Sequence, residues 1–427
     1  PAIRDNEGNT RTDNDINYDG TFYLVLICGG FGVIASGFIL GVMMRFPETI
    51  IQFATFYSLG MSFIFVLFGI WSQQVYIVLT GLLLFLSELC YAYAVWFFIP
   101  FASINLKVGL SAVRSNLGIA LLAYIFVALS LLWTCLWSIS LVGIFQVNGC
   151  SDGSSCLENT NSGFLVTMFL SLFWTLQVIQ NVSTTSIAGV IGTWWFTPAD
   201  ASCFCSRAVR DSFIRATTYS FGSICLGSLL VAIIQTIQQL VKQVRYANEQ
   251  ERQGVACDAI LLCLADCLLS CIDSLLEYFN KFSFIYCGLY GYGYFEAGKK
   301  VMTLFRARAF EVIISDDLVN NSLLLTSLIV GLISGCVGLI IEKVESSWFE
   351  VFGESSMIMA FLLGFIVGWL LASIMFSVVA SSVNTVIVLC CEAPAEFQQN
   401  HPELSNELWR EWRRSGRAPI GSSVVLI

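Results

Sequence analysis

Two amides and an aromatic side chain share one face of a long apolar segment at residues 173–196, FWTLQVIQNVSTTSIAGVIGTWWF. Trp174, Gln177 and Asn181 have i, i+3 and i+7 spacing, which places them on the same side of a helix. The segment is long enough to cross a bilayer, and amides at that depth must face other helices or a polar cavity. An aromatic ring beside such a cavity attracts an organic cation. Two interpretations stay open: contact with a ligand, or hydrogen bonds between packed helices.

Five further residues are candidates for the same chemistry. Glu88, in LLLFLSELCYAYAVW, is a carboxylate near the middle of an apolar run, where such a group binds a cation, carries a proton or pairs within a bundle. The alternative is that the run ends earlier and leaves Glu88 at the interface. Gln235, in LLVAIIQTIQQLV, allows the same two interpretations as the other amides. Trp194, Trp195 and Tyr219 offer aromatic faces for a cation, although a Trp pair at the end of a span is also an ordinary interfacial anchor.

Candidate catalytic and metal-binding groups are few. The chain has one histidine, His401, in a polar C-terminal segment, whereas Ser–His–Asp and Cys–His catalysis need a histidine beside the nucleophile. Cys263, Cys267 and Cys271 recur at i, i+4 and i+8 along a single helical stripe. A metal site needs ligands that converge from separate elements or have chelate spacing such as C-x-x-C. We therefore predict no enzyme, no metal site and no cofactor.

The composition is that of a membrane protein. Of the 427 residues, 56% are hydrophobic and 12% are charged, about half the charged fraction of a soluble domain. The mean hydropathy is +0.76. The basic residues form no clustered face of the kind that nucleic acid requires, so we expect no nucleic-acid partner.

Apolar runs long enough to cross a membrane recur along the chain. They predict an all-α fold, a polytopic transmembrane helix bundle of about nine spans within residues 22–391. A polar extramembrane segment at 1–21 precedes this bundle, and a cytosolic tail at 392–427 follows it. The runs lie at about 22–45, 48–71, 74–99, 117–145, 164–196, 213–241, 275–295, 318–342 and 357–391.

The connections between the runs bear on topology. Residues 100–116 form a weakly amphipathic stretch, predicted as an interfacial helix or as the cytosolic start of the next span. The polar loop at 146–163 contains Cys150 and Cys156, which we predict to form a disulfide in a non-cytosolic compartment. With this loop outside, strict alternation puts most of the Lys and Arg residues inside, as the positive-inside rule requires. The basic segment KQVRYANEQERQG at 242–254 does not follow this rule, so the topology of 242–273 stays open.

Several stretches together resemble the choline transporter-like (solute carrier 44-type) membrane proteins, especially their fungal and protist branch. The resemblance covers about residues 43–409 in the family's order and implies ten spans, the first of which would precede Pro1. The stretches are MMRFPETIIQF, WFFIPFASINLKVGL, FWTLQVIQNVSTTSIAGVIGTWWF, SFGSICLGSLLVAIIQ, LEYFNKFSFIYCGLYGYGYFEAGKKV, ISDDLVNNSLLLTSLIVG and CCEAPAEFQQNHPELSNELW.

This resemblance implies transmembrane transport of choline or a related small amine such as ethanolamine. We expect alternating access around a site near the midplane, with Gln177 and Asn181 as the main contacts. Membrane lipids and a protein partner in a larger assembly are further expected partners, and the plasma membrane is the expected location, with an organelle membrane as the alternative. Two other functions stay open: a non-transporting structural or partner subunit, and a lipid-handling protein.

Overall fold

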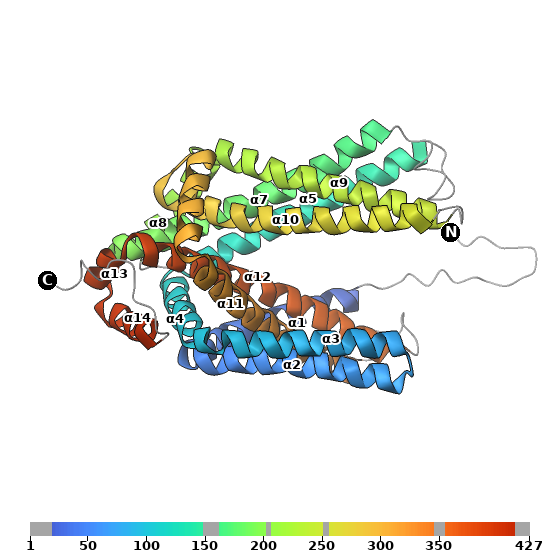
Figure 1. Cartoon of the computed structure of the whole chain (residues 1–427), viewed down its shortest axis with the longest axis horizontal. Helices are drawn as coiled ribbons and strands as arrows, with labels where there is room; N and C mark the ends of the chain where they lie inside the picture. Colours follow the sequence, from blue (N-terminus) through green and yellow to red (C-terminus); the bar gives the residue numbers. More distant parts are fainter. Residues whose placement is uncertain (1–18, 148–161, 202–205, 251–255, 346–354, 415–427) are drawn as a thin grey trace, which may run out of the picture. The chain divides into compact units, whose positions relative to one another are not determined.

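The computed structural model describes residues 19–147, 162–201, 206–250, 256–345 and 355–414. Every regular element in these ranges is a helix, which confirms the all-α prediction (Figure 1). The elements are α1 (Asp19–Arg45), α2 (Pro47–Trp71), α3 (Val75–Val95), η1 (Trp96–Phe98), α4 (Ile99–Ser115), α5 (Gly118–Val147), α7 (Ser162–Phe196), η2 (Pro198–Asp200), α8 (Arg207–Thr217), α9 (Phe221–Gln250), α10 (Ala256–Tyr290), α11 (Tyr294–Val344), α12 (Ser356–Glu392), α13 (Pro394–Asn400) and α14 (Pro402–Arg414).

The helices confirm a polytopic membrane protein. Within the described ranges, 8 helical segments have the length and composition to cross a membrane. They are Tyr23–Arg45, Pro47–Trp71, Val75–Ser115, Gly118–Gly143, Val166–Phe196, Phe221–Lys242, Val312–Val344 and Ser356–Glu392. The run predicted at 275–295 is not among them.

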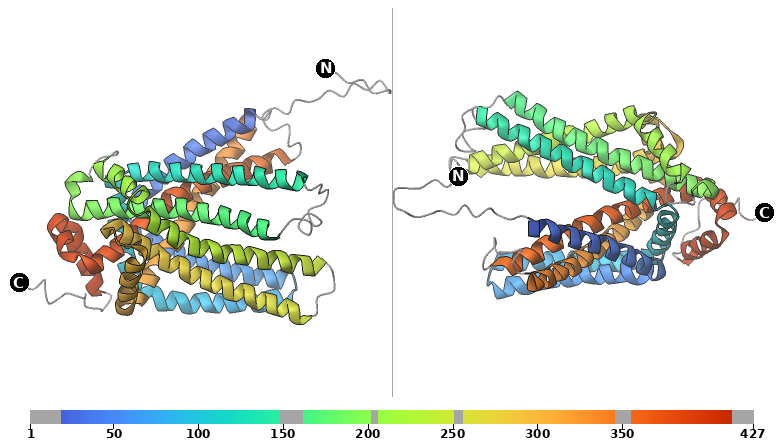
Figure 2. Two further views of the ribbon diagram at one scale, coloured as in Figure 1. Left: turned by 90° about the horizontal axis from the view of Figure 1, so that it is seen from above. Right: turned by 180° about the vertical axis from the view of Figure 1, so that it is seen from behind.

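That run belongs to α10, which differs from the prediction in length and character. The helix begins at Ala256 and runs without a break to Tyr290, so the cysteine-rich stretch before residue 275 is part of it. Asp266, Asp273, Glu277 and Lys281 lower its apolar character. The helix packs against α7 and α9, and all three lie side by side in both further views (Figure 2). Hydropathy alone underestimated α10, because it does not register that side chains such as Glu277 and Lys281 have partners on other helices.

Two compact units make up the chain, and α11 and α12 contribute to both. The first comprises Pro1–Arg45 and Leu323–Phe376, and the second comprises Phe46–Ser322 and Ser377–Ile427. In the first unit the helices approach closely at glycines. A Cβ added at Gly32 would lie 3.2 Å from the Cα of Gly368, and one at Gly338 would lie 2.4 Å from the carbonyl oxygen of Ala360. Only glycine allows this separation, because any side chain would meet backbone.

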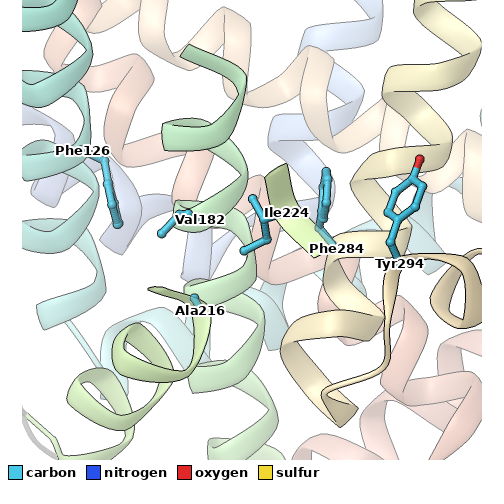
Figure 3. Close-up of a cluster of buried hydrophobic side chains, with 6 residues drawn as sticks. All are labelled: Phe126, Val182, Ala216, Ile224, Phe284 and Tyr294. Carbon is cyan, nitrogen blue, oxygen red and sulfur yellow. The ribbon is translucent and has the colours of Figure 1, made fainter. Parts of the chain in front are cut away.

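In the second unit, α7 is the central helix and packs against α5, α8, α9 and α10. A buried apolar cluster joins six helices, from α5 through α11 (Figure 3). Its members are Phe126, Val182, Ala216, Ile224, Phe284 and Tyr294. Because each side chain comes from a different helix, this cluster fixes the arrangement in which the polar side chains of α7, α9 and α10 meet.

The stretch predicted at 100–116 forms a separate helix, α4, which ends where Asn116 leaves the helical conformation. Most of α4 is buried, and Arg114 is its only exposed residue. The segment predicted as a tail contributes to this burial, because it contains the two helices α13 and α14. The Lys107 ammonium lies 2.5 Å from a carboxylate oxygen of Glu407, and the rings of Phe101 and Trp412 are 5.2 Å apart.

Candidate functional site

Side chains from three helices form a hydrogen-bonded chain between α7, α9 and α10. The Gln177 amide nitrogen donates to the Gln235 amide oxygen at 3.4 Å, and the Gln235 nitrogen donates to a carboxylate oxygen of Glu277 at 3.0 Å. We call Gln177, Gln235 and Glu277 the polar seam. Its donors are amides and its terminal acceptor is a carboxylate, the kind of acceptor that forms the stronger hydrogen bonds. The seam therefore ends on an exposed carboxyl group where three helices pack together.

Further polar contacts extend the same helix junctions. The Asn181 nitrogen donates to the Ser228 hydroxyl at 2.9 Å, linking α7 to α9. The Asn280 nitrogen donates to the carbonyl oxygen of Gly227 at 3.1 Å, and the Tyr294 hydroxyl donates to the Asn280 oxygen at 2.5 Å. These amides are buried and have partners, so they hold the helices in register. The polar seam differs from these contacts because its last member, Glu277, is a carboxylate.

A second polar cluster joins α10 to α3 and α11 within the same unit. The Lys281 ammonium lies 2.7 Å and 2.9 Å from the two carboxylate oxygens of Asp316. The Asn320 amide also donates to Asp316, at 3.0 Å, and the Tyr91 hydroxyl donates to Asp317. We call Tyr91, Lys281, Asp316, Asp317 and Asn320 the ion-pair cluster. It is separated from Glu277 by one turn of α10.

Negative groups outnumber positive groups in this region. Asp316 and Asp317 are adjacent on α11, and Glu88 lies one turn before Tyr91 on α3, close enough to interact with its hydroxyl. Lys281 is the positive partner that the structure gives to Asp316. Because like charges that lie close together repel one another, the surplus of carboxylates favours a further cation.

The amides singled out from the sequence lie where α7 and α9 meet. Gln177 and Gln235 are hydrogen-bonded to each other, and Asn181 lies on the same helix pair. The Trp174 indole donates to the carbonyl oxygen of Cys225 at 3.0 Å and is 38% exposed. Both interpretations of these amides, packing and ligand contact, stay open. Gln177 and Gln235 form hydrogen bonds between helices, and Gln235 is also bonded to the Glu277 carboxylate. Glu88 belongs to the ion-pair region of α3 instead.

The Trp pair has another set of contacts. Trp194 and Trp195 are buried by the C-terminal helices: Trp195 stacks on Phe397 at 3.9 Å and Trp194 on His401 at 4.1 Å. The Trp195 indole donates to the carbonyl oxygen of Ala393 at 2.8 Å. Substrate contact by either ring stays a prediction, and the contacts in the structure are those of a docking site for α13.

Tyr219 is 87% exposed and borders a different cavity, formed by α7, η2, α8 and the turn that follows α8. This cavity has a volume of about 390 Å³. Its lining residues are Thr193, Asp200, Arg207, Ala208, Asp211, Ser212, Ile214, Arg215 and Tyr219. The structure therefore does not bring Tyr219 together with the polar seam.

Sequence reasoning missed the charged members of both clusters. Glu277 and Lys281 lie in LLEYFNKF, and Asp316 and Asp317 lie in ISDDLVNN, and none of the four was singled out from the sequence. Their signal was a set of charges inside apolar runs, including a Glu–Lys pair at i, i+4 spacing. Cys150 and Cys156 lie outside the described residues, so their disulfide stays a prediction. Within the described residues, no group of three or more His, Cys, Asp or Glu side chains is placed to hold a metal ion.

Comparison with known families extends over most of the chain. Residues 77–395 match the family model described as plasma-membrane choline transporter. The chain belongs to this family. The matched range includes the polar seam and the ion-pair cluster, so both lie in the family's characteristic region.

Curated fungal relatives named Protein PNS1 share this similarity. The protein of Mycosarcoma maydis is 31% identical over 276 residues, which cover 64% of this chain and 50% of that protein. The protein of Gibberella zeae is 28% identical over 83% of this chain and 65% of its own length. The protein of Saccharomyces cerevisiae is 26% identical over 93% of this chain and 75% of its own length. The chain therefore spans about half to three quarters of the length of these relatives.

Proposed function

We propose that this protein transports choline or a related small amine such as ethanolamine across the membrane by alternating access. The observation that carries the proposal is Glu277, a carboxylate bonded to an amide from another helix at a three-helix junction. The family description supports the same substrate class and the plasma membrane as the location. A carboxylate at such a junction provides the charge that an organic cation needs when it leaves water.

The seam's hydrogen bonds are suited to exchange with a cargo. Gln235 is the central member, because its oxygen accepts from Gln177 while its nitrogen donates to Glu277. An ethanolamine ammonium donates to the same oxygens, whereas a quaternary ammonium interacts through charge and aromatic faces alone. Trp174, one turn before Gln177 on α7, supplies a partly exposed ring. Amide side chains rotate without breaking the helix backbone, so the bonds that close the seam also open without unfolding.

Uptake by purified protein tests the proposal. The full chain is reconstituted into liposomes, and uptake of radiolabelled choline and ethanolamine is compared with protein-free liposomes. We expect Glu277→Gln to reduce uptake by about tenfold or more, since hydrogen bonds to a charged group contribute about 1.5–3 kcal/mol. The matched control is Glu296→Gln, which removes an exposed carboxylate from the first turn of α11. Uptake that does not depend on protein, or that is equal in the two variants, would contradict the proposal.

Lipid handling is a second candidate, favoured by the exposure of Glu277. This carboxylate is exposed next to apolar side chains of α10 such as Leu275, which is 72% exposed. A polar group beside an open apolar face is a feature of a path for lipid headgroups. The same liposomes distinguish the two functions: flipping of a fluorescent phospholipid that requires Glu277, without amine uptake, supports lipid handling.

A further inference from the structure

The Lys281 ammonium lies in a site with the chemistry of an ammonium receptor. It contacts both oxygens of the Asp316 carboxylate, and it lies 5.9 Å from the centroid of the Tyr278 ring. A carboxylate and an aromatic face within this distance are the groups that bind an organic ammonium in proteins. The Asn320 amide, which also donates to Asp316, orients the carboxylate. The protein therefore supplies both a binding site for an ammonium group and, on Lys281, the ammonium group that occupies it.

Stability is a weak explanation for this ion pair. The Asp316 side chain is 9% exposed and the Lys281 side chain 28% exposed, so both ions have lost much of their hydration. The cost of removing charges from water largely offsets their attraction, and such pairs contribute little net stability. What the pair does provide is a positive charge whose position can change, because the four-carbon stem of lysine is flexible.

Glu277 offers Lys281 a second acceptor on the same helix. The two residues have i, i+4 spacing with the glutamate on the N-terminal side, the favourable order for a Glu–Lys pair on a helix. Rotation of the lysine side chain thus moves the ammonium from Asp316 to Glu277 with no change in the α10 backbone. This movement leaves Asp316 without its cation, next to Asp317 in the chain, and it frees the position beside the Tyr278 ring that the ammonium had occupied.

We propose that Lys281 is a tethered competitor of the transported amine. Its ammonium occupies the Asp316–Tyr278 site, and the cargo ammonium binds there when Lys281 turns to Glu277. This inference rests on the proposed function, and it adds a location for the cargo and a residue that sets its affinity. A competitor that occupies the site for a fraction of the time weakens the apparent affinity by the corresponding factor. Lys281 would therefore lower affinity for the cargo although it lies in the binding site.

Removing the competitor tests this directly, with tetramethylammonium chloride as the probe. Its binding to the purified full chain is measured by calorimetry, with sodium chloride at the same ionic strength as the reference. We expect Lys281→Gln and Lys281→Met to bind the probe about tenfold more tightly than the natural sequence, as for a lysine that occupies the site about nine tenths of the time. We expect Lys281→Arg to keep the weaker affinity, because it keeps the charge.

Two controls separate competition from damage. Lys299→Gln removes an exposed lysine near the start of α11 and should leave the affinity unchanged. Asp316→Asn should abolish binding of the probe in a protein that still elutes as a single species. Lys281→Gln retains a hydrogen-bonding side chain for Asp316, and it decides the question if Lys281→Met does not fold. Binding by Lys281→Gln that is equal to or weaker than that of the natural sequence would overturn the proposal.

The uptake experiment and the probe-binding experiment test separate claims, and either claim can be rejected alone. Tighter probe binding by Lys281→Gln, without amine uptake in liposomes, would support the site and reject the transport function. Amine uptake by the natural sequence, together with unchanged probe binding in Lys281→Gln, would support transport and reject the role of Lys281.

Discussion

Glycines bring helix backbones together in both compact units, since an added Cβ at Gly288 of the second unit would lie 2.4 Å from the carbonyl oxygen of Thr185, and the units differ in the side chains that join their helices. In the first unit, glycines let the backbones touch, as where an added Cβ at Gly338 would meet the carbonyl oxygen of Ala360. In the second unit, amides and carboxylates such as Gln235 and Glu277 join α7, α9 and α10. Contacts between backbones have no polar group to exchange with a ligand, whereas bonds between side chains can be exchanged. We therefore expect the glycine contacts to be rigid, and the exchangeable amide–carboxylate bonds of the polar seam to carry the chemistry.

The largest expected effect tests whether every polar contact of the second unit is exchangeable. Trp195→Ala removes a buried ring that stacks on Phe397, and it leaves the carbonyl oxygen of Ala393 without its donor. We expect a loss of stability of about 3–5 kcal/mol, as for large-to-small changes in a core. Thermal unfolding in detergent measures it. Affinity for tetramethylammonium in the folded fraction should stay unchanged. A lowered affinity would show that Trp195 contributes to substrate binding.

The next prediction tests the rigidity of the first unit. Gly338→Val places side-chain atoms where α11 and α12 are in backbone contact, and we expect it to cost about 3 kcal/mol because neither backbone can yield. The comparison is Gly37→Ala, since an added Cβ at Gly37 meets nothing within 4 Å and alanine favours a helix. Unfolding temperatures of the two variants provide the measurement. Equal unfolding temperatures would show that the glycine contacts are not essential.

The smallest effect on stability should accompany a large effect on transport. Gln235→Leu removes both hydrogen bonds of the seam's central residue, and we expect a cost of about 1–2 kcal/mol in unfolding free energy. Amine uptake should nevertheless fall by about tenfold, because Glu277 loses the amide that orients it. Gln180→Leu, at an exposed amide position on α7, serves as the control. A variant that keeps full uptake would show that the seam is only a packing device.

Much of the fold was predictable from hydropathy. Long apolar runs must be helical in a membrane because lipid offers no partner for backbone N–H and C=O groups. Eight of the predicted runs accordingly match helical segments with the length and composition of a span. The exception was α10, whose start at Ala256 lies well before the predicted run. Its polar residues obscured the helix in the hydropathy pattern, because hydropathy does not register that Glu277 has a partner on α9 and Lys281 a partner on α11.

The candidate site was predictable only in part. Gln177 and Gln235 stood out as amides in apolar runs, and the structure shows them hydrogen-bonded to each other. Their acceptor Glu277 was overlooked, because a carboxylate in a mixed segment such as LLEYFNKF has no unusual local pattern. Glu88 was singled out as a charge in an apolar run, although the hydrogen bond of its neighbour Tyr91 to Asp317 on another helix could not be inferred from spacing.

By itself, the sequence determined the class of the protein, the family and most of the helices. These properties follow from local composition, because each span satisfies its own backbone hydrogen bonds. Only the tertiary structure decided that Lys281 faces Asp316, that Glu277 completes the amide chain, and that the C-terminal helices bury Trp195. Such pairings join residues that are distant in the chain, and they depend on the register in which the apolar side chains of neighbouring helices pack. Polar side chains therefore meet where packing places them, and no spacing along the chain encodes that meeting.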